Sequence, residues 1–158
     1  GGVTVMLRYT LRLLTTQQRD RITKMVVAAE LIRRQAYPLF GSEPISIGFW
    51  VGGGVTPNKF SEFNEKPDNP QAARTARNHV YKQLLTCPFC GVPLKEENFN
   101  IDVDKESTEI YCSDKDCQFY RYKNDRIPIP VYLVDEYITN AQQLFCPRLI
   151  SLLDFLGM

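Results

Sequence analysis

Apolar and polar positions change their period twice within the first 51 residues. Val3–Leu7 is a short, β-branched and apolar run, which is typical of a strand covered on both faces. From Thr10, a predicted N-cap, to the Tyr37–Pro38 exit, the spacing is helical. The predicted buried face consists of Leu11, Leu14, Ile22, Met25, Val26, Ala29 and Ile32, and the predicted polar faces carry Arg12, Arg19, Arg21, Lys24, Arg33 and Arg34. A second apolar run, Ile45–Val51, follows, so strand, helix and strand predict a βαβ unit in a parallel α/β sheet.

The rest of the chain predicts shorter elements. Residues 60–70 (FSEFNEKPDNP) are polar and proline-rich, which favours a linker or mobile loop. Gln71–Leu85 predicts a second, weaker helix, and Ile127–Val134 predicts a third strand. Pro147–Gly157 begins with proline, ends with glycine and is apolar between them, which predicts a short helix that must cover a surface.

Two close cysteine pairs carry the strongest chemical signal. Cys87, Cys90, Cys112 and Cys117 read C-x2-C-x21-C-x4-C. Each pair can place two thiolates on one turn, and two facing turns form a tetrahedral four-sulfur set suited to zinc. Four sulfurs leave no open coordination position, so the predicted zinc is structural. Disulfides or reactive thiols are the alternative, but nothing marks the chain as secreted, and paired cysteines in a reducing compartment are more often metal ligands.

The segment between the cysteine pairs resembles a ribbon. Phe99–Val103 and Thr108–Cys112 both alternate apolar and polar residues, which predicts a β-hairpin. Outside this segment, His79 is the only histidine and lies in a helical stretch, where a surface or packing role is expected. Cys146 is interpreted as a small buried hydrophobe. The sequence therefore predicts no catalytic residue.

Charge separates the chain into two halves. Residues 1–86 carry 12 Lys and Arg against 6 Asp and Glu, a net charge of +6, whereas residues 87–158 carry 7 against 12, a net charge of −5. Contacts to nucleic acid are therefore expected in the first half, because phosphate neutralisation needs clustered cations.

No apolar run is long enough to cross a membrane and no signal peptide is evident, which favours a cytoplasmic protein. The opening GGVTVML lacks an initiator methionine, so we expect a fragment of a longer chain.

Two loops at predicted strand ends could meet a ligand. Residues 8–18 lead from a strand into a helix and offer free amides, a threonine hydroxyl and two arginines, a combination suited to phosphate. Residues 52–59 (GGGVTPNK) offer flexible amides, a hydroxyl and a cation. A helix cap and an ordinary turn are the structural alternatives for these two loops.

Four stretches resemble a known family: GGVTVMLRYTLRLLTTQQ, SIGFWVGGGVTPNKF, CPFCG and IPVYLVDE. Over about residues 1–138 the chain is similar to the large helicase subunit of DISARM anti-phage defence systems, the DrmA type, a superfamily 2 helicase-like protein. The resemblance implies part of a RecA-like first domain in residues 1–85, a zinc-ribbon insertion in 86–121, and a return strand with a C-terminal helix in 122–158. It also implies seven residues that contact the nucleic-acid backbone, namely Arg8, Thr10, Arg12, Gln17, Thr56, Asn58 and Lys59.

The chain departs from a complete helicase in its nucleotide site. A phosphate-binding loop of the form GxxxxGK[ST] is absent, because GFWVGGGVT lacks the lysine. In the family that loop lies upstream, so ATP and Mg²⁺ are implied only for the full-length parent protein. Asp135 and Glu136 at a strand end could be read as a Mg²⁺-binding motif, but the family's acidic motif would come later, and a capping or solvated role is the preferred interpretation.

The leading hypothesis is therefore a piece of an ATP-dependent DNA helicase or translocase that contacts the DNA backbone without sequence preference and has a defence-system partner subunit. The alternative is a zinc-ribbon protein–protein interaction module, which the acidic second half and the apolar tail favour. A free-standing metalloenzyme would need an open zinc position.

Overall fold

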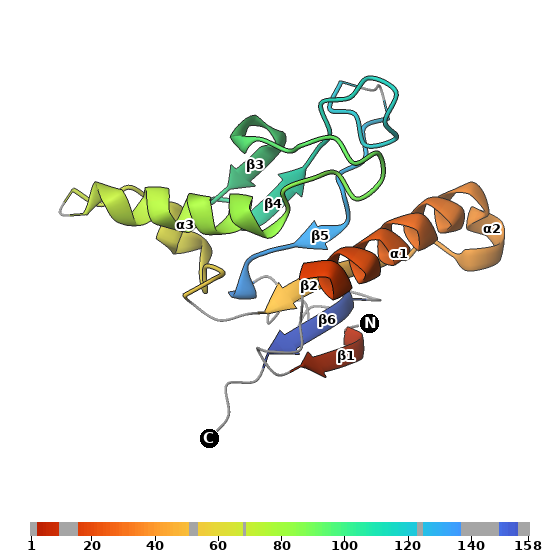
Figure 1. Ribbon diagram of the computed structural model, residues 1–158, viewed down its shortest axis with the longest axis horizontal. Helices are drawn as coiled ribbons and strands as arrows, with labels where there is room; N and C mark the ends of the chain where they lie inside the picture. Colours follow the sequence, from red (N-terminus) through yellow and green to blue (C-terminus); the bar gives the residue numbers. More distant parts are fainter. Residues whose placement is uncertain are drawn as a thin grey trace.

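The computed structural model describes residues 3–9, 16–50, 54–67, 69–122, 125–136 and 149–154 (Figure 1). For residues 3–9, 16, 50 and 149–154 the description covers the backbone alone.

A four-stranded parallel sheet forms the centre of the fold. Its strands are β1 (Val3–Tyr9), β2 (Ser46–Trp50), β5 (Val131–Tyr132) and β6 (Leu149–Asp154), in the order β1-β6-β2-β5. All neighbouring pairs are parallel, so the arrowheads of β1, β2 and β6 in Figure 1 point to one side. The helix α1 (Thr16–Gln35) lies between β1 and β2 in the chain and packs on β2. The predicted α/β class and βαβ unit are confirmed.

The C-terminal helix was a wrong prediction for the residues described there. Leu149–Asp154 is strand β6, which lies between β1 and β2 and pairs Leu149 with both Val3 and Ser46. Central strands of parallel sheets are typically covered on both faces, so their sequences are mainly apolar and lack the alternation that marks a half-exposed strand, as LISLLD does here. A short continuous apolar run of this kind cannot be distinguished from a buried helix by its period.

The helix α1 presents a different face from the predicted one. Met25 and Ile32 are 61% and 57% exposed, whereas Glu30 and Arg33 are buried. The buried positions also include Thr23, Val26 and Val27. Charged side chains can turn inward because each finds a partner there, and their methylene stems pack against apolar neighbours.

A short four-residue helix, α2 (Tyr37–Phe40), follows α1, and none of its residues is buried.

Further along the chain, the predicted polar linker is anchored by two aromatic residues. Phe60 and Phe63 are both buried in a 3-10 helix, η1 (Phe60–Phe63), with ring centroids 6.1 Å apart. They pack beside α3 (Pro70–Gln83), whose N-cap Asn69 accepts a hydrogen bond from the Ala72 amide at 3.2 Å. The interpretation as a mobile loop was wrong for residues 60–63, because two phenyl rings gain more from burial than the polar residues around them lose.

The predicted ribbon is present and shares the main core. A 3-10 turn, η2 (Glu96–Asn98), leads into the antiparallel hairpin of β3 (Phe99–Asp102) and β4 (Ser107–Ile110). Buried residues of the ribbon join one apolar cluster with residues of α1, β2, α3 and β5, including Val26, Ile47, Val80, Phe99 and Phe119. None of the helices in the described ranges has the length and apolar composition needed to cross a bilayer.

Candidate functional site

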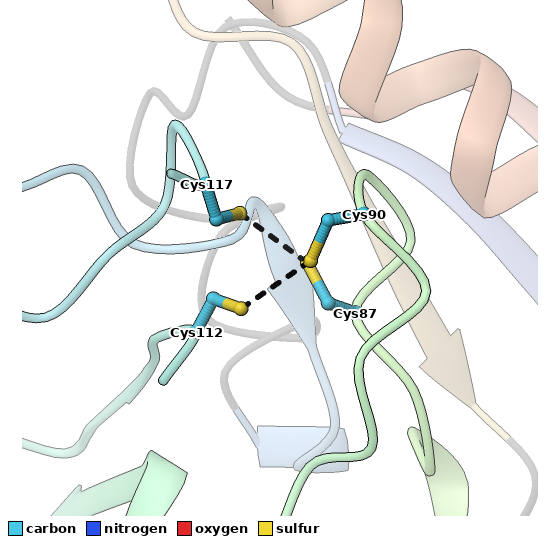
Figure 2. Close-up of side chains that lie close together, drawn as sticks. All are labelled: Cys87, Cys90, Cys112 and Cys117. Carbon is cyan, nitrogen blue, oxygen red and sulfur yellow. Dashed lines mark hydrogen bonds between the residues drawn. The ribbon is translucent and has the colours of Figure 1, made fainter. Parts of the chain in front are cut away.

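Four cysteine sulfurs converge between two loops. The Sγ atoms of Cys87, Cys90, Cys112 and Cys117 all lie within 4.8 Å of one another, and Figure 2 shows the side chains pointing toward a common centre. The Cys87–Cys117 and Cys90–Cys112 sulfur separations are 3.8 and 3.5 Å. Zinc–sulfur bonds of about 2.3 Å in a tetrahedron separate the sulfurs by about 3.8 Å, so the spacing is compatible with zinc. A disulfide requires about 2.0 Å, and these four thiols are free.

Local backbone geometry holds each pair. In the first loop the Cys87 amide donates to the Val92 carbonyl and the Gly91 amide donates to the Cys87 carbonyl, both at 2.8 Å. Gly91 has a φ of 80°, a left-handed conformation that favours glycine. In the second loop the Cys112 amide donates to the Phe119 carbonyl at 2.8 Å. The CPFCG turn is thus closed by two backbone hydrogen bonds, and the left-handed conformation of Gly91 allows the chain to form them.

Backbone amides also point at the sulfurs. The Asp114 amide donates to Cys112 Sγ and the Phe119 amide donates to Cys117 Sγ, each at 3.4 Å. Amides aimed at sulfur stabilise its anionic form, which is the form that binds metal.

The protonation of the cluster shows why it suits a cation. Burial raises the pKa of Cys87 to about 12, and burial likewise raises the pKa of Cys117. Burial also acts to raise the pKa of Cys90, but hydrogen bonds, chiefly from the Val92 amide and Cys112, outweigh burial and lower this pKa. Four mutually close thiols do not ionise together unless a cation neutralises them, and a bound metal removes these protons outright. The four cysteines therefore form a closed group that could hold a metal ion.

The predicted nucleic-acid contacts at the start of the chain are described only in part. Thr10 and Arg12 lie outside the described residues, and Arg8 is described only by its backbone in β1. Gln17 is exposed in the first turn of α1.

The other predicted contacts lie together on the loop that follows β2. Asn58 and Lys59 are exposed. Thr56 is fully buried, and its hydroxyl donates to Asp135 Oδ1 at 2.8 Å. Thr56 therefore supports the loop from inside, whereas Asn58 and Lys59 present their side chains to solvent.

Asp135 and Glu136 hold this loop in place. Their amides donate to the Pro57 and Asn58 carbonyls at 3.0 and 2.9 Å. The carboxylate of Glu136 accepts a hydrogen bond from the Phe60 amide at 2.9 Å. These bonds agree with the capping interpretation of the acidic pair.

A second link was not predicted from the sequence. Arg19 Nη1 donates to Gln83 Oε1 at 2.7 Å, and Gln83 Nε2 donates to the Val55 carbonyl at 3.0 Å. The Arg19 guanidinium also lies 5.7 Å from the ring centroid of Phe49. These contacts join α1, β2, α3 and the loop after β2. No local pattern could reveal them, because Arg19 and Gln83 are 64 residues apart.

Replacing Asp135 with asparagine is expected to alter the pH dependence of folding. Burial is the largest influence and raises the pKa of Asp135 to about 6, helped by the nearby charge of Glu62 and opposed by the hydrogen bond from Thr56. The unfolded value is about 3.9, so between about pH 4 and pH 6 the folded state binds more protons and stability falls as pH rises. Asparagine keeps the acceptor but cannot titrate, so Asp135→Asn gains stability relative to the parent as pH rises through this window. Urea unfolding at several pH values checks this.

The exposed Asp125 supplies the matched control. Asp125→Asn makes the same chemical change at an exposed position and gives the reference for the curve of stability against pH. If stability against pH runs parallel for Asp135→Asn and the parent, burial does not raise the pKa of Asp135.

Comparison with known proteins gives one relative. No protein-family model matches the chain. Over 144 residues the chain is 40% identical to the DISARM protein DrmA of Bacillus paralicheniformis, an alignment that covers 87% of this chain and 12% of that protein. The chain thus spans 12% of the length of the curated relative that it matches. The resemblance to the DrmA type of DISARM protein, which four short stretches predicted, is therefore confirmed over most of the chain.

Proposed function

We propose that the chain is part of an ATP-dependent DNA helicase or translocase of a DISARM anti-phage defence system. In this proposal it supplies contacts to the nucleic-acid backbone, while zinc bound by the four cysteines braces the ribbon. The 40% identity to a DISARM protein DrmA is the observation that carries the proposal. The remainder of the parent protein would supply the phosphate-binding loop, since GxxxxGK[ST] is absent from the printed sequence.

The sheet supports the proposed contact residues. Because β1 and β2 run parallel within one sheet, their carboxyl ends lie at the same edge. In open α/β sheets, ligands meet that edge. Arg8 lies one residue before the end of β1, and residues 56–59 follow β2 in the chain, so both predicted contact segments begin at or beyond the carboxyl end of a strand. Asn58, Lys59 and Gln17 are exposed and can donate to phosphate oxygens.

The proposed zinc ion has a structural role. Cys87, Cys90, Cys112 and Cys117 would hold it, and thiolate ligands in a tetrahedral set favour zinc over hard cations. A bound zinc ion would tie the loop before β3 to the loop after β4. All four positions are sulfur, so the ion would have no open position for a substrate.

Replacing Arg8 and Arg12 together with alanine is expected to weaken DNA binding and to reduce its dependence on salt. Each lost phosphate contact lowers the slope of log affinity against log salt by about 0.9 for duplex DNA or about 0.7 for single strands. Fluorescence anisotropy with labelled strands over a salt series measures both quantities. Lys105 and Lys115, exposed cations of the ribbon, provide a control pair of equal charge. If the arginine pair changes neither affinity nor slope, residues 8–12 do not contact DNA.

A second candidate function is a protein-interaction module. Leu85 and Phe89, beside the first cysteine pair, are 62% and 47% exposed. Exposed apolar side chains on a braced loop suit contact with a partner subunit. Capture of a purified defence-system partner should then be lost on replacing Phe89 with serine and on removing the metal with a chelator. Retention of the partner in both cases would exclude this function for the ribbon.

A further inference from the structure

One face of α3 carries positive charge that the proposed contacts do not use. The helix sequence PQAARTARNHVYKQ contains two arginines and a lysine but no acidic residue. Arg74, Arg77, Asn78 and Tyr81 recur at spacings of three and four, which places them on one face of the helix. Together with Glu96 they line a pocket of about 320 Å³.

In the described part of the chain, the two arginines share the pocket lining with Glu96 but are not paired with it. Neither Arg74 nor Arg77 forms an ion pair there. Arg77 is held in position instead: its guanidinium lies 5.9 Å from the ring centroid of Phe63, and Nη2 donates to the Phe63 carbonyl at 3.4 Å. The Tyr81 side chain, which lines one side of the pocket, is held by packing against Phe99, with ring centroids 5.1 Å apart.

Such a pocket suits a phosphate group. A guanidinium presents a planar set of donors that matches the oxygens of phosphate, and a second arginine and an amide one turn apart add donors from the same side. Because Arg77 is already ordered by Phe63, it loses less conformational freedom on binding than a solvated arginine does.

Arg77 links the pocket to η1, which directly follows the proposed DNA-contacting loop in the chain. Lys59 is the N-cap of η1, and η1 packs directly against α3. In Figure 1, α3 extends toward the side of the molecule to which the arrowheads of β1, β2 and β6 point.

We infer that Arg74, Arg77 and Asn78 bind a backbone phosphate of the nucleic-acid strand that contacts Asn58 and Lys59. This inference rests on the proposed function and adds a site outside the strand-end loops. Glu96 is the one acidic residue of the pocket lining. Its charge opposes a phosphate, so it weakens binding at this position and offers a test in the opposite direction.

The test measures binding of a labelled oligothymidine strand to the zinc-loaded protein over a salt series. Arg74→Ala is chosen first because Arg74 is exposed, whereas Arg77 also packs on Phe63. We expect its affinity to fall about fivefold to tenfold and its salt slope to fall by about 0.7. Glu96→Gln is expected to raise the affinity severalfold. Lys105→Ala removes one exposed cation from the hairpin turn and should change the affinity little.

Three outcomes are distinguishable. Opposite shifts for Arg74→Ala and Glu96→Gln, with Lys105→Ala unchanged, support the phosphate site. Weakening by Lys59→Ala without any effect of Arg74→Ala or Glu96→Gln overturns the α3 site and leaves the proposed function intact. Failure of the parent protein to bind any strand overturns both.

Discussion

Replacing Cys112 with serine is expected to abolish zinc binding and to unfold the ribbon around it. Cys112 is fully buried, and its sulfur lies 3.5 Å from that of Cys90. A serine hydroxyl does not replace a thiolate ligand, so one corner of the tetrahedron is lost. Structural zinc sites contribute apparent binding free energies of about 10–16 kcal/mol near neutral pH, which exceeds the whole stability of many small domains.

The loss should extend beyond the ribbon. Phe99, Ile110 and Phe119 share one apolar cluster with Val80 of α3 and Val131 of β5. Disordering the cysteine loops therefore exposes the side of α3 that faces the hairpin. Hydrogen exchange should show lost protection in residues 86–121 and in α3, and metal analysis should show less than one zinc ion per chain.

Serine at position 113 provides the matched control. Ser113 is adjacent to Cys112 but exposed, so Ser113→Ala should keep both the metal and the protection pattern. A chelator applied to the parent protein should reproduce the effect of Cys112→Ser. A metal-free protein with native exchange protection would contradict the structural role of the site.

Replacing Glu30 with alanine is expected to destabilise the protein by about 3–5 kcal/mol, because it leaves a buried cation without its counter-charge. Glu30 is 1% exposed and accepts hydrogen bonds from Arg33 Nε and Nη2 at 2.7 and 2.8 Å. Arg34 Nε and the Ile45 amide each donate to it at 2.7 Å. The carboxylate thus joins the last turns of α1 to the segment that enters β2.

The measurement is the free energy of unfolding in urea. Arg34→Ala is the control, since Arg34 is 38% exposed and an exposed ion pair is worth at most about 1 kcal/mol. Replacing Glu30 and Arg33 together with methionine and leucine should recover much of the loss, because no buried charge then remains. A loss below about 1 kcal/mol for Glu30→Ala would show that the buried pair does not hold α1 on β2.

Glu30 also makes the stability of the protein depend on pH in acid. Burial acts to raise the pKa of Glu30, but hydrogen bonds from Arg33, the Ile45 amide and Arg34 outweigh it and lower the pKa. A carboxyl whose pKa is lower when folded stabilises the protein above its unfolded pKa. That stability is lost as the pH falls through the folded pKa. Acid therefore weakens the contact between α1 and β2 in the parent protein but not in the double variant.

Features with a short-range cause were predictable from the sequence. The cysteine pairs lie close in the chain, and their turns are encoded locally by Pro88 and Gly91. The alternation of β3 and β4 likewise reports a hairpin whose two strands are neighbours in sequence. The four stretches that resemble the DrmA type of DISARM protein identified the relative that the comparison found.

Features that depend on distant partners were not predictable. The inward position of Arg19 depends on Gln83, 64 residues away, and that of Glu30 depends in part on the Ile45 amide, 15 residues away, whereas hydropathy assigns both charged residues to the surface. Phe60 and Phe63 lie in a polar segment whose composition favours a loop, but α3 offers them an apolar surface. In each case, tertiary packing outweighs the local preference.

Strand β6 has a consequence for how the protein folds during synthesis. Among the described strands, β1 pairs only with β6, so Val3 can find its partner Leu149 only after all the residues between them have left the ribosome. Until then β1 and the facing edge of β2 present unpaired amides and carbonyls, which are templates for association with other nascent chains. The ribbon can fold earlier, because its strands are neighbours in sequence, whereas the sheet forms late and slowly. Its assembly is therefore the step at which a chaperone would be of most use.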